Sequence, residues 1–372
     1  MTTKLRFPFT AFVDQEKLKV AYLANIVNPR IGGLLISGPK GTGKSTIVHS
    51  VVDILPDYQA VEGCIFECDP EDLGHFCSQC QQRSKIDVVT RPMRIITLPL
   101  SCTEDRLIGS IDIETLLKTG EKEVIPGILG MAHRNILYVD EVNLLPDHLV
   151  DDILDAAALH WNRIEREGIS IAHPADFVLI GTMNPEEGDL RPQILDRFPL
   201  CVKLKTVSDR DARVEIVKRN LLFEESTYEL IQQYHDKQKK VADMIESARS
   251  LLGRVSVSDV LIEAVARSCA DLKVDGQRPD IVITKTAKTL ASLDQRTDVG
   301  TDDIILAAEM ALVHRTRDGG LLEPPAVEEI QKVFRENISN ARAAEKIEPH
   351  TPVEKKDSGQ FAETAQTKKK KK

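Results

Sequence analysis

The chain has 372 residues, 42% of them hydrophobic and 29% charged, an ordinary globular composition with room for two or three domains. Its formal net charge of −9 disfavours nucleic acid as a partner, because neutralising phosphates requires a basic face. No apolar run approaches the ~20 residues that span a membrane, and the first residues show no signal-peptide stretch, so we expect a cytoplasmic protein.

The N-terminal region predicts a glycine-rich loop between a strand and a helix. The segment 7–15 either lines a base pocket or simply caps the structure, and an amphipathic helix is expected after it, to about Val27. A short buried strand at 34–37 then leads into the loop. The loop and the first residue of the helix after it are Gly38, Pro39, Lys40, Gly41, Thr42, Gly43, Lys44, Ser45 and Thr46.

This loop has the chemistry of a triphosphate site. Glycines let the backbone N–H groups turn toward a polyphosphate, and the helix N-terminus adds its positive end. Lys44 can reach the β- and γ-phosphates, and the Ser45 hydroxyl can hold Mg²⁺. The sequence therefore predicts that the chain binds a nucleoside triphosphate.

Four of the seven cysteines lie close together in the polar, irregular segment 56–90. They are Cys64, Cys68, Cys77 and Cys80. In a cytoplasmic protein we expect thiols rather than structural disulfides. Thiolates at this density suit tetrahedral Zn²⁺, and the second pair has ligand spacing, although the first pair is one residue wider than usual. A redox-sensitive set of thiols and a loop with incidental cysteines remain the alternatives.

The middle of the chain predicts a pair of carboxylates at a strand end. A second strand is expected at 93–99, then an inserted hairpin or loop at about 103–126 and a short helix at 128–134. A continuous apolar strand from residue 135 ends in Asp140 and Glu141. Carboxyl ends of parallel strands open beside the phosphate loop, so Asp140 is expected in the Mg²⁺ shell and Glu141 beside the attacking water.

The next elements deliver an amide and two arginines. A helix at 146–161, a β-hairpin at 162–177 and a buried strand at 177–182 precede Asn184, whose amide can sense a γ-phosphate. A short helix at 190–198 carries Arg191 and Arg197, before a strand at 200–204. Arg197 would suit the site of a neighbouring subunit, or it forms a local ion pair with Asp196.

The C-terminal part is expected to be helical. From residue 208 onward, apolar spacing predicts four to six helices. Arg278 lies in the first turn of one of them, where it either meets the γ-phosphate from a lid or is solvated. Beyond about residue 340 the polar chain is expected to be disordered, and its final lysines are interpreted as a solubilising tail.

Taken together, these motifs resemble AAA+ ATPases of the helix-2-insert group, and within them the I subunit of magnesium chelatase. The most specific stretches are E-R-E-G-I-S at 165–170 and N-P-E-E-G-D-L-R-P-Q at 184–193, with further likeness at 7–10, 64–80, 98–106 and 136–145. The resemblance implies an α/β fold: an AAA+ P-loop domain with a parallel sheet and inserted β-hairpins, followed by an all-α lid domain. The implied divisions are 1–205 for the nucleotide-binding domain, with a cysteine-rich insert at about 60–82 and hairpins at about 103–126 and 162–177, then 206–320 for the lid and 321–372 for a C-terminal extension.

The resemblance also implies a role for each motif, with ATP and Mg²⁺ as cofactors. The loop would be Walker A, and Asp140 with Glu141 would be Walker B. Asn184 would be sensor 1, and Arg197 the arginine finger with Arg191 as an auxiliary interface arginine. Arg278 would be sensor 2. Two positions depart from the family pattern, since Asp14 stands where a turn glycine is expected and Met183 where a small residue is expected.

The family pattern implies a motor that works with partners. It implies a homo-oligomeric ring that joins a second AAA+ subunit with an integrin-like domain and drives a large porphyrin-binding subunit to insert Mg²⁺ into protoporphyrin IX. The chain has no D-x-S-x-S run, so it is not the integrin-bearing subunit. The alternatives are the ATPase of a cobalt or other tetrapyrrole chelatase and a MoxR-like chaperone that activates a metalloprotein.

Overall fold

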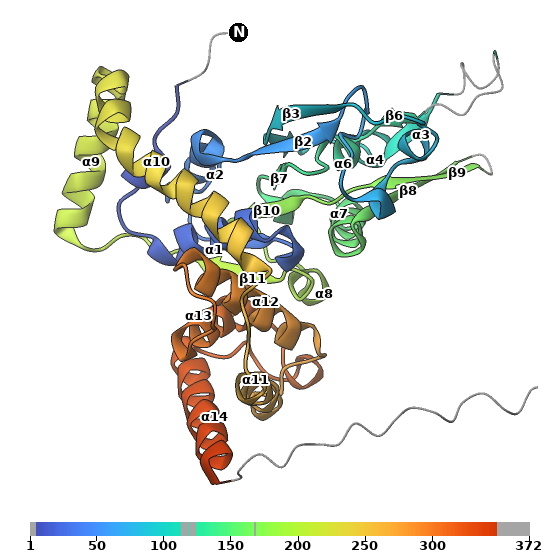
Figure 1. Cartoon of the computed structure of the whole chain (residues 1–372). Coiled ribbons are helices and arrows are strands. Elements are labelled where there is room, and N and C mark those ends of the chain that lie inside the picture. The colour runs from blue at the N-terminus through green and yellow to red at the C-terminus, as the bar shows by residue number, and fades with distance from the viewer. Residues whose placement is uncertain (1–4, 113–117, 119–123, 167–168, 348–372) are drawn as a thin grey trace, which may run out of the picture.

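A five-stranded parallel sheet forms the centre of the computed structural model, which describes residues 5–112, 118, 124–166 and 169–347 (Figure 1). The strand order is β11-β1-β10-β7-β4, and all four pairings are parallel. Strands covered on both faces are expected to be continuous apolar runs, which is how the sequence predicted them. The bounds are β1 (Leu34–Ser37), β4 (Ile95–Leu98), β7 (Ile136–Val139), β10 (Val178–Met183) and β11 (Leu200–Lys203).

Successive residues of each strand point to opposite faces, and each face has its own helical cover. Leu34 and Ile36 of β1 lie in the core shared with α1 (Glu16–Val27) and α2 (Lys44–Ser50). Leu35, between them, lies in the core shared with α6 (Ile128–Met131), α7 (Asp147–Leu159) and α8 (Pro192–Leu195). The helix expected at 146–161 ends at Leu159, and Trp161 instead begins a strand.

Three antiparallel hairpins are inserted between these elements and gather at one end of the molecule (Figure 1). They are β2 (Asp57–Val61) with β3 (Val88–Pro92), β5 (Gly109–Ile111) with β6 (Val124–Pro126), and β8 (Trp161–Arg166) with β9 (Ile169–Pro174). Helix α3 (Ser78–Gln81) lies inside the first, and α4 (Glu104–Ile108) precedes the second. The hairpin prediction at 162–177 is confirmed. The first hairpin was missed, because the sequence predicted only irregular chain over 56–90.

Six helices follow β11 in the described part of the chain, in agreement with the four to six expected. They are α9 (Arg210–Glu225), α10 (Thr227–Leu252), α11 (Asp259–Asp271), α12 (Arg278–Leu293), α13 (Thr301–Leu312) and α14 (Val327–Ile347). Helix α10 packs on α1, and α13 packs beside the edge strand β11, so the helical part covers the α1 side of the sheet (Figure 1). Among the described helices, none has the length and apolar character needed to cross a bilayer.

Helix α14 corrects the expectation of disorder beyond about residue 340. It continues to Ile347, and it packs on α11 and α13. Its core residues are spaced by one helical turn: Ile330, Phe334, Ile338 and Ala341 are buried. The lysine run lies outside the described residues.

Candidate nucleotide-binding site

The phosphate loop connects β1 to α2 in the order that the sequence predicted. Gly41 and Gly43 both have φ +78°, a left-handed conformation that suits glycine, and α2 begins at Lys44. Gly38 is also required for space, because a Cβ there would lie 2.9 Å from the Cβ of Leu204. The Lys44 ammonium lies over the loop and donates to the carbonyl oxygens of Gly38 at 2.5 Å and Pro39 at 2.9 Å.

Asp140 and Glu141 follow β7 and lie beside the loop. The Ser45 hydroxyl oxygen is 3.4 Å from both carboxylate oxygens of Asp140. Burial lowers the pKa of Lys44, and the negative charges of Asp140 and Glu141 oppose that shift. Neighbouring ligands of an octahedral Mg²⁺ at about 2.1 Å lie about 2.9 Å apart, so Ser45 and Asp140 fit this ion after a small adjustment.

Thr182 on β10 holds both acidic residues in place, and sequence reasoning missed it. Its hydroxyl donates to Asp140 Oδ1 at 2.6 Å and accepts the Glu141 backbone N–H at 3.1 Å. Glu141 has φ +50°, an uncommon conformation for a side chain of this size. Thr182 is therefore a positioning residue for the carboxylate pair. One hydroxyl inside an apolar strand left no signal for this role in the sequence.

Asn184 lies where the sequence placed it, directly after β10. Its side chain is buried, and its Oδ1 accepts the Glu186 backbone N–H at 3.2 Å. Its amide nitrogen has no hydrogen-bond partner among the described residues. A buried donor without a partner is costly, so this amide suits an anionic oxygen. Met183, which is larger than the residue expected at this position, packs in the core on the α7 side of the sheet.

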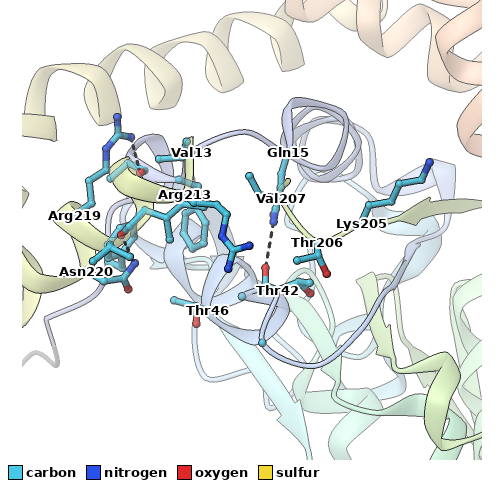
Figure 2. Close-up of a pocket in the computed structure, with 17 residues that line it drawn as sticks. Val13, Gln15, Thr42, Thr46, Lys205, Thr206, Val207, Arg213, Arg219 and Asn220 are labelled. Atoms are coloured by element: carbon cyan, nitrogen blue, oxygen red, sulfur yellow. Dashed lines mark hydrogen bonds between the residues drawn. The ribbon is translucent and has the colours of Figure 1, made fainter. Parts of the chain in front are cut away.

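A cavity of about 540 Å³ opens beside the loop, between the N-terminal segment and α9 (Figure 2). Segment 7–15 lines it, which favours the base-pocket alternative over simple capping. The Gln15 side-chain amide donates to the Thr42 carbonyl oxygen at 3.1 Å. Asp14 adopts the left-handed conformation of the glycine expected there, with φ +62°. Figure 2 shows Arg213 of α9 extending toward Thr42, a contribution that sequence reasoning also missed.

Arg197 and Arg191 lie against α7 rather than in this cavity. Arg197 forms ion pairs with Asp155 and, at 2.6 Å, with Asp151. Arg191 pairs with Asp147 at 2.7 Å. The three aspartates are spaced by four residues and therefore share one face of α7.

The main chain around Arg197 is held by the segment after α13. Asp196 accepts the Thr316 hydroxyl at 2.6 Å and the Thr316 backbone N–H at 3.1 Å, so Asp196 is not the ion-pair partner of Arg197 that the sequence allowed. His314 Nε2 donates to the Phe198 carbonyl oxygen at 2.8 Å. His314 and Thr316, which follow α13, thereby hold the main chain on both sides of Arg197 in position.

Arg278 begins α12 as expected. Burial lowers its pKa, and the positive charge of Arg197 adds to that shift while Asp155 opposes it. The charges that act on the pKa of Lys44 are instead the carboxylates of Asp140, Glu141, Glu187 and Glu186. The role of Arg278 at the γ-phosphate stays a prediction.

A five-stranded parallel sheet with a phosphate loop after β1, carboxylates after β7, an amide after β10 and a helical lid defines an AAA+ ATPase. The chain matches the family model described as "Magnesium chelatase, subunit ChlI" over residues 15–196 and the "AAA lid domain" model over 262–336. It belongs to the family of magnesium-chelatase subunit ChlI, as its relatives show.

Two curated relatives illustrate the membership. The magnesium-chelatase subunit ChlI homolog of Methanocaldococcus jannaschii is 47% identical over 333 residues, which cover 89% of this chain and 91% of that protein. The chloroplastic ChlI subunit of Oryza sativa subsp. indica is 46% identical over 88% of this chain and 81% of that protein. Among solved structures, a chain of the BchI–BchD complex of magnesium chelatase has a TM-score of 0.51 and 37% identity, covering 89% of this chain and all of that one.

Proposed function

We propose that this chain is the ATP-hydrolysing motor subunit of a multi-subunit magnesium chelatase, in which ATP hydrolysis drives insertion of Mg²⁺ into protoporphyrin IX. One arrangement carries the motor assignment: Lys44, Ser45 and Asp140 lie around one phosphate loop, whereas Arg197 and Arg191 pair with aspartates of α7. Family membership supports the chelatase assignment. ATP and Mg²⁺ are the proposed cofactors, and the proposed location is cytoplasmic.

Each residue around the phosphate loop has a defined task. Lys44 binds the β- and γ-phosphates, while Ser45 and Asp140 hold the Mg²⁺ that neutralises phosphate charge. Glu141 accepts a hydrogen bond from the attacking water and polarises it, and the partnerless amide of Asn184 orients that water or the γ-phosphate. Gln15, Arg213 and the rest of the cavity take the nucleoside.

The arginines that pair with α7 complete the nucleotide site of a neighbouring copy. An arginine presented in trans stabilises the charge of the phosphoryl-transfer transition state and changes hydrolysis by about 10³–10⁵. Arg197 is proposed for this role in a homo-oligomeric ring, with Arg191, which also pairs with α7, and Arg278 as supporting arginines. The further proposed partners are an AAA+ subunit with an integrin-like domain and a large porphyrin-binding subunit, with no nucleic acid involved.

Mixed rings test the motor part. Glu141→Gln should bind ATP without turnover, and Arg197→Ala should bind ATP but hydrolyse it at least 100-fold more slowly. Mixing the two inactive variants should restore hydrolysis, because some interfaces then combine an intact Glu141 with an intact Arg197. Lys44→Ala, which should not bind ATP, is the matched control and should restore nothing with Glu141→Gln. No recovery in the first mixture would refute the trans assignment.

A reconstituted insertion assay tests the chelatase part. The chain is combined with porphyrin- and corrin-binding partner subunits, and insertion of Mg²⁺ is compared with insertion of Co²⁺. ATP-dependent Mg²⁺ insertion into protoporphyrin, absent with Glu141→Gln, is the expected result. Co²⁺ insertion alone would favour the other chelatase, and binding of an unrelated enzyme client without insertion would favour the chaperone.

A further inference from the structure

The insert between β2 and β3 has a small core of its own, and cysteines make up most of it. Its members are Val61, Cys64, Phe66, Cys68, Phe76, Cys77 and Cys80. All four cysteines are buried free thiols, with exposed fractions between 0% and 8%. Three apolar side chains are too few to stabilise a segment of this length by burial alone, and natural domains with so small a core use a metal or disulfides.

The four sulfur atoms are arranged as a ligand set. All of them lie within 4.8 Å of one another, and Cys64 Sγ is 3.8 Å from Cys77 Sγ. A tetrahedral Zn²⁺ with Zn–S bonds of about 2.3 Å places its sulfurs about 3.8 Å apart. A disulfide requires about 2.05 Å between two sulfurs, far shorter than the 3.8 Å between Cys64 Sγ and Cys77 Sγ. The geometry fits a four-coordinate metal better than it fits a pair of disulfides.

Backbone hydrogen bonds present both cysteine pairs in tight turns. The Cys64 N–H donates to the Val61 carbonyl oxygen at 3.2 Å, and the Val61 N–H donates to the Cys68 carbonyl oxygen at 3.0 Å, which closes the first turn. Cys77 precedes α3 and Cys80 lies within it. The Cys77 N–H also donates to Cys68 Sγ at 3.3 Å, a contact that stabilises a thiolate.

We propose that Cys64, Cys68, Cys77 and Cys80 bind one structural Zn²⁺. Four protein ligands close the coordination shell, so the ion has no open position for substrate and no role in phosphoryl transfer. Binding converts four thiols into thiolates, and their protons pass to water without any change of oxidation state. This site is independent of the nucleotide site, and failure of either proposal leaves the other intact.

The metal would fix the insert against the β8–β9 hairpin. Phe66, inside the cysteine turn, stacks on His173 of β9 with ring centroids 4.4 Å apart and planes at 11°. His75, two residues before Cys77, stacks on Trp161 of β8 with ring centroids 5.9 Å apart. Gly130 leaves room for Phe66, since a Cβ there would lie 3.0 Å from its ring. Loss of the ion should therefore loosen both the insert and the hairpin.

Metal analysis of the full chain, purified under reducing conditions and dialysed after addition of zinc alone, tests the proposal. We expect one zinc per chain, and none for the double variant Cys77→Ser with Cys80→Ser. Cys102→Ser is the matched control and should keep its zinc, because this buried cysteine lies outside the cluster. Wild-type chain without zinc, or a double variant that keeps it, would overturn the proposal.

A cobalt measurement on the wild-type chain keeps the test valid if the double variant does not fold. Replacing zinc by Co²⁺ should give the visible absorption of a tetrahedral ion together with intense thiolate-to-metal charge transfer. An octahedral, thiolate-free spectrum would refute the site. Disulfides among these cysteines in the non-reduced chain, found by peptide mass spectrometry with no bound metal, would establish the redox alternative instead.

Discussion

Thr182→Val removes the hydroxyl that bonds the Asp140 carboxylate and the Glu141 backbone N–H, while keeping the shape of the side chain. The variant loses the 2.6 Å hydrogen bond to Asp140 and leaves the Glu141 backbone N–H without its acceptor. A hydrogen bond to a charged group contributes about 1.5–3 kcal/mol. Asp140 and Glu141 are half-buried, so water replaces part of this contribution, and we expect a net loss of about 2 kcal/mol. At the transition state that corresponds to a roughly thirtyfold slower hydrolysis.

The assay is steady-state ATP hydrolysis by the assembled protein at varied Mg²⁺. Thr182→Val should lower the maximal rate and raise the Mg²⁺ requirement, with little change in nucleotide affinity because the phosphate loop is untouched. Thr182→Ser keeps the hydroxyl and should stay within about threefold of wild type, since it loses only a methyl group. Equal losses in both variants would show that packing matters and the hydrogen bonds do not. An unchanged rate in Thr182→Val would refute the positioning role.

Two further predictions concern Arg278 and the buried His314. Arg278→Ala should slow hydrolysis in the assembled ring at least tenfold without changing the ATP affinity of the isolated chain; a tenfold loss of that affinity would instead place Arg278 at its own nucleotide. Burial lowers the pKa of His314 to about 3 from its ordinary value of 6.5, so the unfolded chain takes up a proton below pH 6.5 that the folded chain does not. The free energy of unfolding should therefore fall from pH 7.5 to pH 5 in urea titrations, and His314→Gln, which keeps a donor for the Phe198 carbonyl oxygen, should reduce the slope; an unaltered slope would contradict this cause.

The strands and the acidic pair were predictable because burial on both faces of a parallel sheet leaves a strong local signal. Continuous apolar runs end abruptly in polar residues at Ser37, Asp140 and Asn184, and the topology brings those ends to one edge. Thr182 gave no such signal, since one hydroxyl inside an apolar strand does not alter the pattern.

Other features depend on packing that no local pattern encodes. Strand β2 is only five residues long and alternates exposed and buried residues from Asp57 to Ala60, while its partner β3 is mostly exposed and carries no alternation. For α14, the polar composition beyond residue 340 favoured disorder, whereas the helix continues to Ile347 from a part whose Ile330, Phe334 and Ile338 are buried in the core.

The acidic face of α7 explains how Arg197 can be held in position in the single chain and still be available to the nucleotide of a neighbouring copy. Arg197 is paired with Asp151 and Asp155, whose side chains are 49% and 62% exposed. Ion pairs with this much solvent contact contribute about 0–1 kcal/mol each, so a triphosphate with several negative charges competes for the guanidinium at little cost. The segment on either side of Arg197 is held independently by Thr316 and His314, and the main chain therefore stays in place while the side chain changes partner. The pairs with α7 thus orient Arg197 in the single chain without withholding it from a neighbouring copy, which is the property that a site completed only on assembly requires.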